Sequence, residues 1–464
     1  MTKQKIFTDF PPVSEKTYKQ KIQVDLKGAD YNDTLVWKSP EGIHVKPFYH
    51  RENLQDNQTH VAAPEQWFIG EDIFILDPTK AVETALNVIS NGTEAIRFIA
   101  DKAFDIDTLL KPLKGKDILL HFELRFLGDT ATNQTVEFVK ALVEKSAHYT
   151  ITSFLNVDPI GNLASDGNWY QSAEEDYEKL QELLTTKGNI LTVDTAHYQN
   201  AGATSVQQLA YGLAHVNEYL NFAETHKLSI DSIRFKVAVG SNYFFEIAKL
   251  RALRMLFDLI KKEYTVAVDT TCHILAKPTR RNKTIYDYNT NMLRSTTECM
   301  SAILGGADTI INRPYDDLYH KANAFGQRIS RNQLIILKKE SYFDAVSNPA
   351  DGTYYIESLT QELASKALSL FKEIEASGGF LQQLKEGTIQ KKVKESAQKE
   401  QDAFNNGEHV LLGTNIHPNP QDKMKNELEL FPFVKQNPRK TILEPIIARR
   451  LAETIEQERL DSEV

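Results

Sequence analysis

The sequence has few cysteines, which could form disulfides, and it has no apolar segment long enough to span a membrane. Among its 464 residues only Cys272 and Cys299 are cysteines, and neither belongs to a CxxC pair. No uninterrupted apolar run is long enough for a bilayer span, and the opening MTKQKIFTDFPPVSEK lacks an apolar signal core. We therefore expect both cysteines to be small core residues of a cytoplasmic protein that does not enter a membrane.

Positive charge and the common catalytic motifs are also scarce. The 54 Lys and Arg residues are outnumbered by 63 Asp and Glu, and no basic stripe interleaved with aromatic residues occurs. This composition argues against a nucleic-acid partner. The motifs HExxH and GxSxG are absent, as are a P-loop and any pair of carboxylates with distinctive spacing. None of the usual metal, hydrolase or nucleotide sites is therefore predicted from a motif.

What the chain does contain is a repeated alternation of helix and strand patterns. The clearest example is NTNMLRSTTECMSAILGGADTIINRPYD, which spans 289–316. Its apolar residues recur about every 3.5 positions, which predicts a helix with one buried face. Gly305 and Gly306 suit the left-handed conformation that ends a helix, and residues 309–311 then predict a short buried strand.

The same alternation extends over most of the chain. The expected strands are 67–76, 95–100, 117–124, 149–157, 189–198, 232–239, 265–274 and 309–311, each followed by an expected helix. Eight short apolar strands that alternate with helices predict an α/β protein with a (β/α)8 TIM barrel. A doubly wound open sheet is the alternative, but no glycine-rich phosphate turn follows an early strand.

Three regions differ in composition. Residues 1–66 are polar and punctuated by proline, which predicts an extended N-terminal arm that docks on a partner. Residues 67–380 are the expected barrel, with an amphipathic helix over 358–379. Residues 381–464 are mostly charged and predict a helical C-terminal extension with a loop at GTNIHPNP.

Polar side chains follow several of the expected strands. In a barrel of this type the carboxyl ends of the strands carry the reactive groups, so we expect a binding site among these residues. They are Asn156 and Asp158, His197 and Asn200, Asp269, Thr270, Thr271 and His273, and Asn312, Arg313 and Asp316.

His197 is the leading catalytic candidate, because an imidazole can donate to a carbonyl oxygen or transfer a proton near neutral pH. The alternative is a histidine bonded to a neighbouring loop. For His273 we expect a structural role, since it and Cys272 point to opposite faces of a strand. Arg251 and Arg254 are expected on a solvated or intersubunit helix face. The basic loop RRNK at 280–283 could contact a phosphate, but a solvated loop is the preferred interpretation.

Five segments of the chain resemble methylmalonyl-CoA mutases, and their sequences most resemble the small, or beta, subunit of the bacterial heterodimeric enzyme. They are ADYNDTLVWKSPEGIHVKPFY, TAHYQNAGATSVQQLAYGL, VGSNYFFEIAKLRALRML, NTNMLRSTTECMSAILGGADTI and RISRNQLIILKKESYFDAVSNPADGTYYIESLT, in the same order as in the family. The resemblance implies a TIM barrel with a coenzyme A thioester along its axis and adenosylcobalamin across its carboxyl end. It also implies radical interconversion of (R)-methylmalonyl-CoA and succinyl-CoA.

Several family features are missing from this sequence. It has no DxHxxG cobalamin loop, no arginine between Arg125 and Arg234 to hold the substrate carboxylate, and no TMY block around 67–76. CHILAKPTRR replaces the coenzyme contact after the seventh strand, and the family's YH pair survives only as Ala196 and His197. The resemblance therefore implies that His197 is retained but vestigial, and that this chain binds no cofactor or metal.

These departures lead to a main hypothesis and two alternatives. We expect a small, non-catalytic subunit that pairs with a large catalytic mutase subunit in a heterodimer of propionate metabolism. Adenosylcobalamin and acyl-CoA would then be bound by the partner. One alternative is an active acyl-CoA-binding barrel that borrows cobalamin from a separate small protein. The other is a homodimeric assembly protein. Whether the barrel channel is open or filled is not predictable from the sequence.

Overall fold

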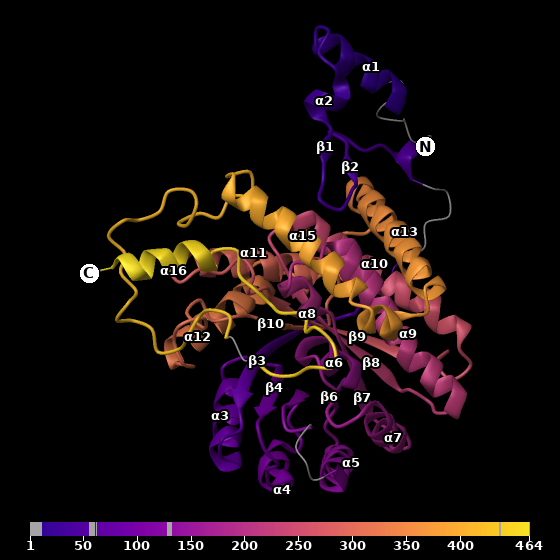
Figure 1. The fold of residues 1–464 in the computed structure, drawn as a ribbon, viewed down its shortest axis with the longest axis vertical. Helices are drawn as coiled ribbons and strands as arrows, with labels where there is room; N and C mark the ends of the chain where they lie inside the picture. The colour runs from indigo at the N-terminus through magenta and orange to yellow at the C-terminus, as the bar shows by residue number, and fades with distance from the viewer. Residues whose placement is uncertain (1–11, 55–60, 62, 128–131, 436–437, 464) are drawn as a thin grey trace, which may run out of the picture.

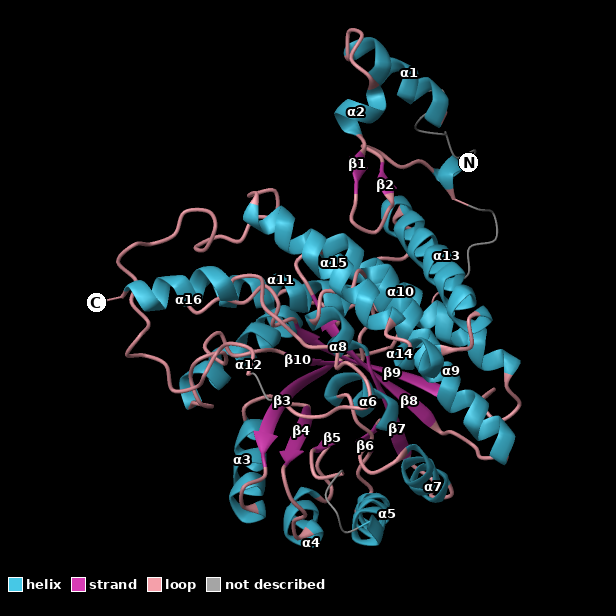
Figure 2. Ribbon diagram, viewed as in Figure 1, coloured by secondary structure: helices cyan, strands magenta, loops and turns pink. Residues whose placement is uncertain are grey.

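A closed barrel of eight parallel strands forms the centre of the molecule (Figures 1 and 2). The computed structural model describes residues 12–54, 61, 63–127, 132–435 and 438–463. The strands are β3 (Phe68–Phe74), β4 (Ala95–Ala100), β5 (Leu119–Leu124), β6 (Ser153–Val157), β7 (Asn189–Asp194), β8 (Ser232–Val239), β9 (Thr271–Pro278) and β10 (Thr309–Ile311). They follow one another around the barrel in chain order, and β10 pairs with β3 to close it. The predicted fold is thus confirmed.

Helices surround this barrel. They are α3 (Pro78–Ser90), α4 (Ile106–Leu110), α5 (Thr132–His148), α6 (Pro159–Asp166), α7 (Ala173–Leu184), α8 (Thr195–Asn200), α9 (Ser205–His226), α10 (Tyr243–Ile260), α11 (Thr290–Leu304), α12 (Ala324–Ile335) and α13 (Tyr354–Ala376). Single turns of 3-10 helix follow α4 and α10, at Lys111–Leu113 and Lys261–Glu263, and the π-helix Ile336–Glu340 extends α12.

Local sequence signals set the helix ends. Asp77 caps α3 by accepting a hydrogen bond from the Lys80 backbone N–H at 3.0 Å, and Pro78 occupies the first turn. Gly306, with φ of +83°, supplies the left-handed residue that follows α11. Gly70 allows close packing of two strands, because a Cβ there would lie 2.6 Å from Ile311 Cγ1 of the adjacent strand. The barrel closes at this point because β3 carries no side chain there.

Five predicted strands differ from the observed ones in their bounds: the first, third and fourth are 68–74, 119–124 and 153–157 instead of 67–76, 117–124 and 149–157, and the fifth and seventh also differ. The seventh strand is Thr271–Pro278 instead of 265–274, because residues 264–270 form turns and Thr270 bonds the Ile230 carbonyl with its hydroxyl. Polar His273 and Lys277 point into the barrel and interrupt the apolar pattern of the true strand. The fifth strand ends at Asp194, and the following TAHYQN forms α8.

The N-terminal arm projects from the barrel beside α13 (Figure 1). Its elements are α1 (Glu15–Asp25), α2 (Tyr31–Leu35), the antiparallel pair β1 (Trp37–Lys38) and β2 (His44–Val45), and a 3-10 turn, Arg51–Asn53. Glu41, in the β1–β2 turn, accepts hydrogen bonds from the backbone N–H groups of Ser205 and Val206 at 2.8 and 3.0 Å. The arm is therefore anchored at the start of α9. Residues 1–11, 55–60 and 62 of the predicted arm lie outside the described residues.

The C-terminal extension is helical only in part. It contains α14 (Phe380–Lys385), α15 (Thr388–Asn405) and α16 (Glu453–Ser462). Between α15 and α16 the described residues of 406–452 form no helix and only one isolated bridge, between Leu412 and Ile416. In Figure 1 this orange-to-yellow segment first loops outward near α16, and its later, yellow part crosses in front of the barrel. In the described part of the chain no helix has the length and apolar character needed to cross a membrane.

The two arginines of α10 are buried, so the prediction of a solvated or intersubunit face was wrong. Arg251 bonds Glu357 at 2.6 Å and Asp351 at 3.2 Å, which ties α10 to α13 and the segment before it. Arg254 bonds Asp308 at 2.5 Å and the carbonyls of Gly306 and Cys272. Helical periodicity identified the helix but could not show that both charges had buried partners.

Replacing Arg251 with Met should lower the free energy of unfolding by about 3–5 kcal/mol, because Glu357 would keep its buried charge without a partner. Urea unfolding followed by circular dichroism measures the change. The double variant Arg251→Met/Glu357→Leu should recover part of the loss, and Arg328→Gln, at an exposed arginine, should change stability by less than about 0.5 kcal/mol. Equal stability of Arg251→Met and the wild type would contradict the assignment.

Candidate functional site

A ring of six charged side chains fills the barrel just below its carboxyl end. The carboxylates are Asp72, Glu123 and Asp194, and the cations are Arg97, Lys236 and Lys277. Arg97 donates to both oxygens of Asp72 at 2.8 and 2.9 Å, and its guanidinium lies 3.5 Å from Glu123. Lys236 bonds Glu123 at 3.1 Å and Asp194 at 2.7 Å, and Lys277 pairs with Asp72. The ring contains as many anions as cations.

The charged side chains of the ring shift one another's pKa values. Burial raises the pKa of Glu123, but Lys236 and Arg97 outweigh it and lower that pKa to about 2. The same balance, with Arg97 and Lys277 as the cations, holds the pKa of Asp72 far below its usual value. Burial lowers the pKa of Lys277 to about 8, against the opposing effect of Asp72. The carboxylates of Asp72 and Glu123 are therefore charged at neutral pH and are neutralised by partners within the ring.

Below the ring, large polar and aromatic side chains fill the barrel axis. Arg234 is fully buried, and its guanidinium donates to Thr192 Oγ1 at 3.0 Å and to the Phe154 carbonyl at 3.3 Å. His121 and His273 both bond Thr309 Oγ1, and His273 packs against the Phe154 ring. Burial lowers the pKa of His273 to about 4, so this imidazole is neutral. TIM barrels usually fill this layer with branched aliphatic residues; here it is filled by buried polar groups.

Two adjoining cavities lie at the mouth, above the ring. The larger, of about 470 Å³, is lined by predicted site residues His197, Asn200, Asn312, Arg313 and Asp316. The smaller, of about 230 Å³, is lined by Asn156 and Asp158 and shares His197 with the first. The rule that strand ends converge thus brought seven of the predicted residues together.

The remaining predicted residues do not reach the mouth. Asp269 and Thr270 precede β9, and Thr271 and His273 lie at its amino end, because the strand begins later than expected. The structural role expected for His273 agrees with its bond to Thr309 inside the barrel.

Irregular C-terminal chain covers the mouth. We call residues 438–452 the mouth strap. Its backbone N–H groups at 442, 443, 446, 449 and 451 donate to carbonyls of Gly167, Ala164, Asn200 and Arg281, all at 2.9 to 3.1 Å. In Figure 1 this yellow segment crosses in front of the barrel close to α6 and α8. The strap therefore bonds to barrel loops on several sides of the opening.

His197 is held by this strap. It lies on α8, and its Nε2 donates to the Ile446 carbonyl at 2.5 Å. Burial lowers the pKa of His197, although Asp194 and the bond to Ile446 oppose that change. The geometry matches the alternative of a histidine bonded to a neighbouring segment, and here that segment lies 249 residues away. Its predicted vestigial character stays a prediction.

The polar groups after β6 are also used within the fold. Asp158 caps α6 and accepts from His215 at 2.9 Å and Tyr219 at 2.6 Å. Asn156 accepts from the backbone N–H of Leu124 at 2.7 Å. Both residues line the smaller cavity, but their oxygens already have internal donors.

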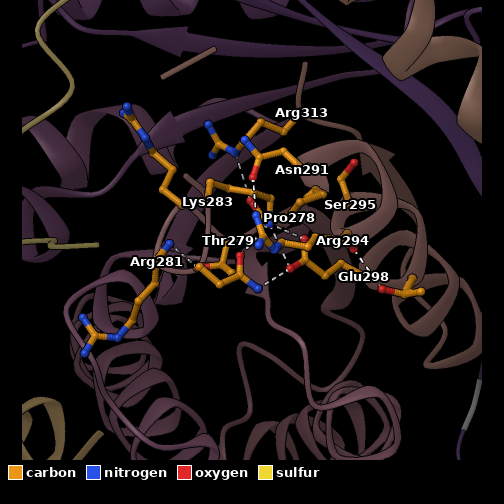
Figure 3. A network of polar contacts seen from close by, with 12 residues as sticks. Pro278, Thr279, Arg281, Lys283, Asn291, Arg294, Ser295, Glu298 and Arg313 are labelled. Atoms are coloured by element: carbon orange, nitrogen blue, oxygen red, sulfur yellow. Dashed lines mark hydrogen bonds and ion pairs between the residues drawn. The ribbon is translucent and has the colours of Figure 1, made fainter. Parts of the chain in front are cut away.

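The loop between β9 and α11 forms a buried network, which is drawn in Figure 3. Lys283 bonds both oxygens of Glu298 on α11 at 2.9 and 2.7 Å, and Asn282 donates to the same carboxylate. Arg281 extends away from this cluster to Glu400 on α15. The expectation of a solvated loop at 280–283 was therefore wrong for all but Arg280, whose side chain is exposed. The neighbouring helices and the C-terminal chain supply the buried partners that the sequence does not reveal.

Sequence reasoning missed the charged ring, although a signal was present. Strands β5 and β8 carry basic or acidic residues at alternating positions, namely His121 and Glu123 in β5 and Arg234 and Lys236 in β8. Alternation with period two places such residues on one face of a strand, here the inner face. Among the described residues no group of His, Cys, Asp or Glu is arranged to hold a metal ion.

Replacing Glu123 with Gln should lower stability at pH 7 by about 3 kcal/mol, and the difference should shrink in acid. The folded-state pKa, about 2, lies below the ordinary value of 4.5. The charged carboxylate therefore stabilises the fold above pH 4.5, and this contribution is lost as the pH falls toward 2. Denaturant unfolding at a series of pH values measures it.

Glu83→Gln on the exposed face of α3 is the matched control and should change stability little at any pH. A gap between the wild type and Glu123→Gln that stays constant from pH 7 to pH 3 would contradict the proposed pairing.

Comparison with known proteins places the chain in a family. The methylmalonyl-CoA mutase family model matches residues 130–459. The small subunit of this enzyme from Porphyromonas gingivalis is 33% identical over 445 residues, which cover 90% of this chain and 72% of that one. The small subunit from Streptomyces virginiae is 30% identical over 396 residues, covering 79% and 63%. A methylmalonyl-CoA mutase from Cereibacter sphaeroides is 36% identical over 239 residues, covering 49% and 33%.

The chain thus spans about three quarters, two thirds and one third of these relatives. The matched region includes the mouth, the loop after β9 and the mouth strap. On this evidence the chain belongs to the methylmalonyl-CoA mutase family.

Proposed function

We propose that this chain is a non-catalytic small subunit that pairs with a large, catalytic mutase chain. The observation that carries the proposal is the filled barrel axis. Resemblance to the family implies that a coenzyme A thioester enters along that axis. Here Arg97, Arg234 and Lys236 occupy it, together with two histidines and a phenylalanine. Opening a channel would separate buried ion pairs, at a cost of several kcal/mol for each pair broken.

The mouth strap supports the same conclusion for the cofactor. The family places adenosylcobalamin across the carboxyl end of the barrel, which is the face that the strap covers. A corrin ring on this face would have to displace five backbone hydrogen bonds and the bond between His197 and Ile446. The described residues therefore do not fit the cofactor, and we propose that adenosylcobalamin and acyl-CoA are bound by the partner.

A heterodimeric arrangement agrees with the names of the relatives. Two of them are small subunits, and such a subunit implies a large one. The N-terminal arm offers a contact surface, because Trp37 on β1 is 48% exposed and Val24 on α1 is 71% exposed. We propose that the arm docks on the large chain and that the pair works in the cytoplasm.

The competing function is an acyl-CoA-binding barrel that borrows cobalamin from a separate protein. The observation in its favour is the cavity of about 470 Å³, which has His197 in its wall. Three of its lining cations, Arg97, Lys236 and Lys277, are already paired with carboxylates, whereas Arg280, which also lines it, has no ion-pair partner among the described residues. A substrate carboxylate that reached the ring would therefore have to compete with internal partners.

To test the proposal, the chain is purified alone and together with a large mutase-family chain. Light scattering should give a one-to-one pair, and only the pair should isomerise methylmalonyl-CoA. Calorimetric titration of the isolated chain with succinyl-pantetheine, the acyl thioester without the nucleotide, should give no saturable heat. Turnover by the chain alone at a rate near that of the pair would refute the proposal.

His197→Gln provides a test inside the pair. Because His197 bonds the strap and has no access to substrate in this proposal, the turnover number should change by less than about twofold. A general acid or base normally contributes about 100-fold or more. A loss of that size, with unchanged pairing by light scattering, would make His197 catalytic.

A further inference from the structure

A basic groove lies between the mouth strap and the chain before it. Its volume is about 540 Å³, within the range of small-molecule sites. The lining includes five basic side chains, Arg125, Arg280, Lys435, Arg449 and Arg450, and only two acidic ones, Asp317 and Glu453. This excess of positive charge stands out in a chain whose net charge is −9. We call it the outer groove.

Arg280 is the central cation of this groove. Its backbone N–H is bonded to Asn200, but within the described residues its guanidinium has no hydrogen-bond or ion-pair partner. Desolvation by the groove walls lowers the pKa of Arg280, and Arg313 and Arg450 lower it further, while Asp317 and Glu453 oppose this change. Both carboxylates have other partners: Asp317 pairs with Arg313, and Glu453 accepts a hydrogen bond from the Arg450 backbone N–H at 3.0 Å. The charge of Arg280 is therefore left for a ligand from outside.

Two further arginines offer their guanidinium groups to the same space. Among the described residues Arg125 forms one ion pair, with Asp101 at 3.5 Å, and lies over the Phe74 ring; the Arg125 and Asp101 side chains are 53% and 66% exposed. Such a surface pair contributes little and is easily exchanged. The backbone N–H of Arg449 donates a hydrogen bond to the Asn200 carbonyl. Its side chain is exposed and has no partner in the part of the chain that the structure describes. Guanidinium groups are well suited to bind phosphate through two parallel hydrogen bonds.

An aromatic wall adjoins these arginines. Phe431 lines the groove and is 59% exposed, although a phenylalanine ring is usually buried. Phe433 packs edge-on against it with ring centroids 5.5 Å apart, and Arg450 lies over the Phe433 ring. These contacts hold Phe431 in place while leaving a flat apolar surface toward solvent. A planar ring could stack there.

From these observations we propose that the outer groove is a binding site for a nucleotide-type ligand. Its phosphates contact Arg280, Arg449 and Arg125, and its base packs on Phe431. The phosphate interpretation of the basic loop at 280–283 is thus proposed for Arg280 alone. The site lies outside the barrel axis, so it does not depend on the proposed role of the chain as a non-catalytic subunit.

The test is calorimetric titration of the full chain with inorganic pyrophosphate and with ADP, at about 150 mM salt so that exposed charges are screened. Both should bind saturably with one ligand per chain, and ADP should bind more tightly. Arg280→Gln should weaken both by about tenfold or more, since a hydrogen bond to a charged group is lost. Phe431→Ala should lower the affinity for ADP but leave the affinity for pyrophosphate unchanged.

Arg328→Gln is the matched control, because Arg328 is exposed and lines neither the mouth nor the outer groove. Thermal unfolding of each variant confirms that it is folded. The proposal is overturned if neither probe binds saturably, or if Arg328→Gln weakens binding as much as Arg280→Gln. Equal affinity for ADP and pyrophosphate that Phe431→Ala does not alter would overturn the assignment of the base. None of these outcomes bears on pairing or turnover, so the two proposals fail separately.

Discussion

The paired charges inside the barrel are the constraint on which the rest of the structure depends. Asp72, Arg97, Glu123, Asp194, Lys236 and Lys277 neutralise one another where a ligand-binding barrel would offer free groups. Buried ion pairs contribute little to stability compared with a well-packed apolar core, but removing one partner lowers the free energy of unfolding by several kcal/mol, about 3–5. The ring therefore acts mainly by making the barrel axis hard to open. A channel cannot form without exposing several unpaired charges.

The barrel was predictable because its signal is local and repeated. Short apolar strands, capped helices and glycine stops recur along the chain, and each can be recognised within a few residues. The strand β9 was misplaced for a physical reason: its inward residues His273 and Lys277 are polar because the barrel core is polar. The position of His197 at the mouth followed from the strand-end rule. Its partner did not, because Ile446 belongs to irregular chain with no periodicity and lies 249 residues away.

The loop after β9 explains why burial was misjudged there. Arg281 and Lys283 find carboxylate partners on α15 and α11, while the carbonyls of residues 281 and 283 accept bonds from the C-terminal chain. Those partners come from elements more than a hundred residues away or from an adjacent helix face. Arg280 is turned the other way, out of the same loop. A run of four basic and polar residues is thus divided between core and surface, which composition alone cannot resolve.

Charge balance separates the inside of the barrel from the outside of the strap. Inside, each carboxylate of the ring has a cationic partner, so an incoming anion gains little there and must first displace Asp72, Glu123 or Asp194. Outside, the carboxylates near Arg280 are Asp317, which pairs with Arg313, and Glu453, which accepts from the Arg450 backbone N–H, so Arg280 itself has no ion-pair partner among the described residues. Electrostatic attraction therefore favours the outer groove over the paired ring inside the barrel. In this chain the strap both covers the mouth and forms one wall of the groove.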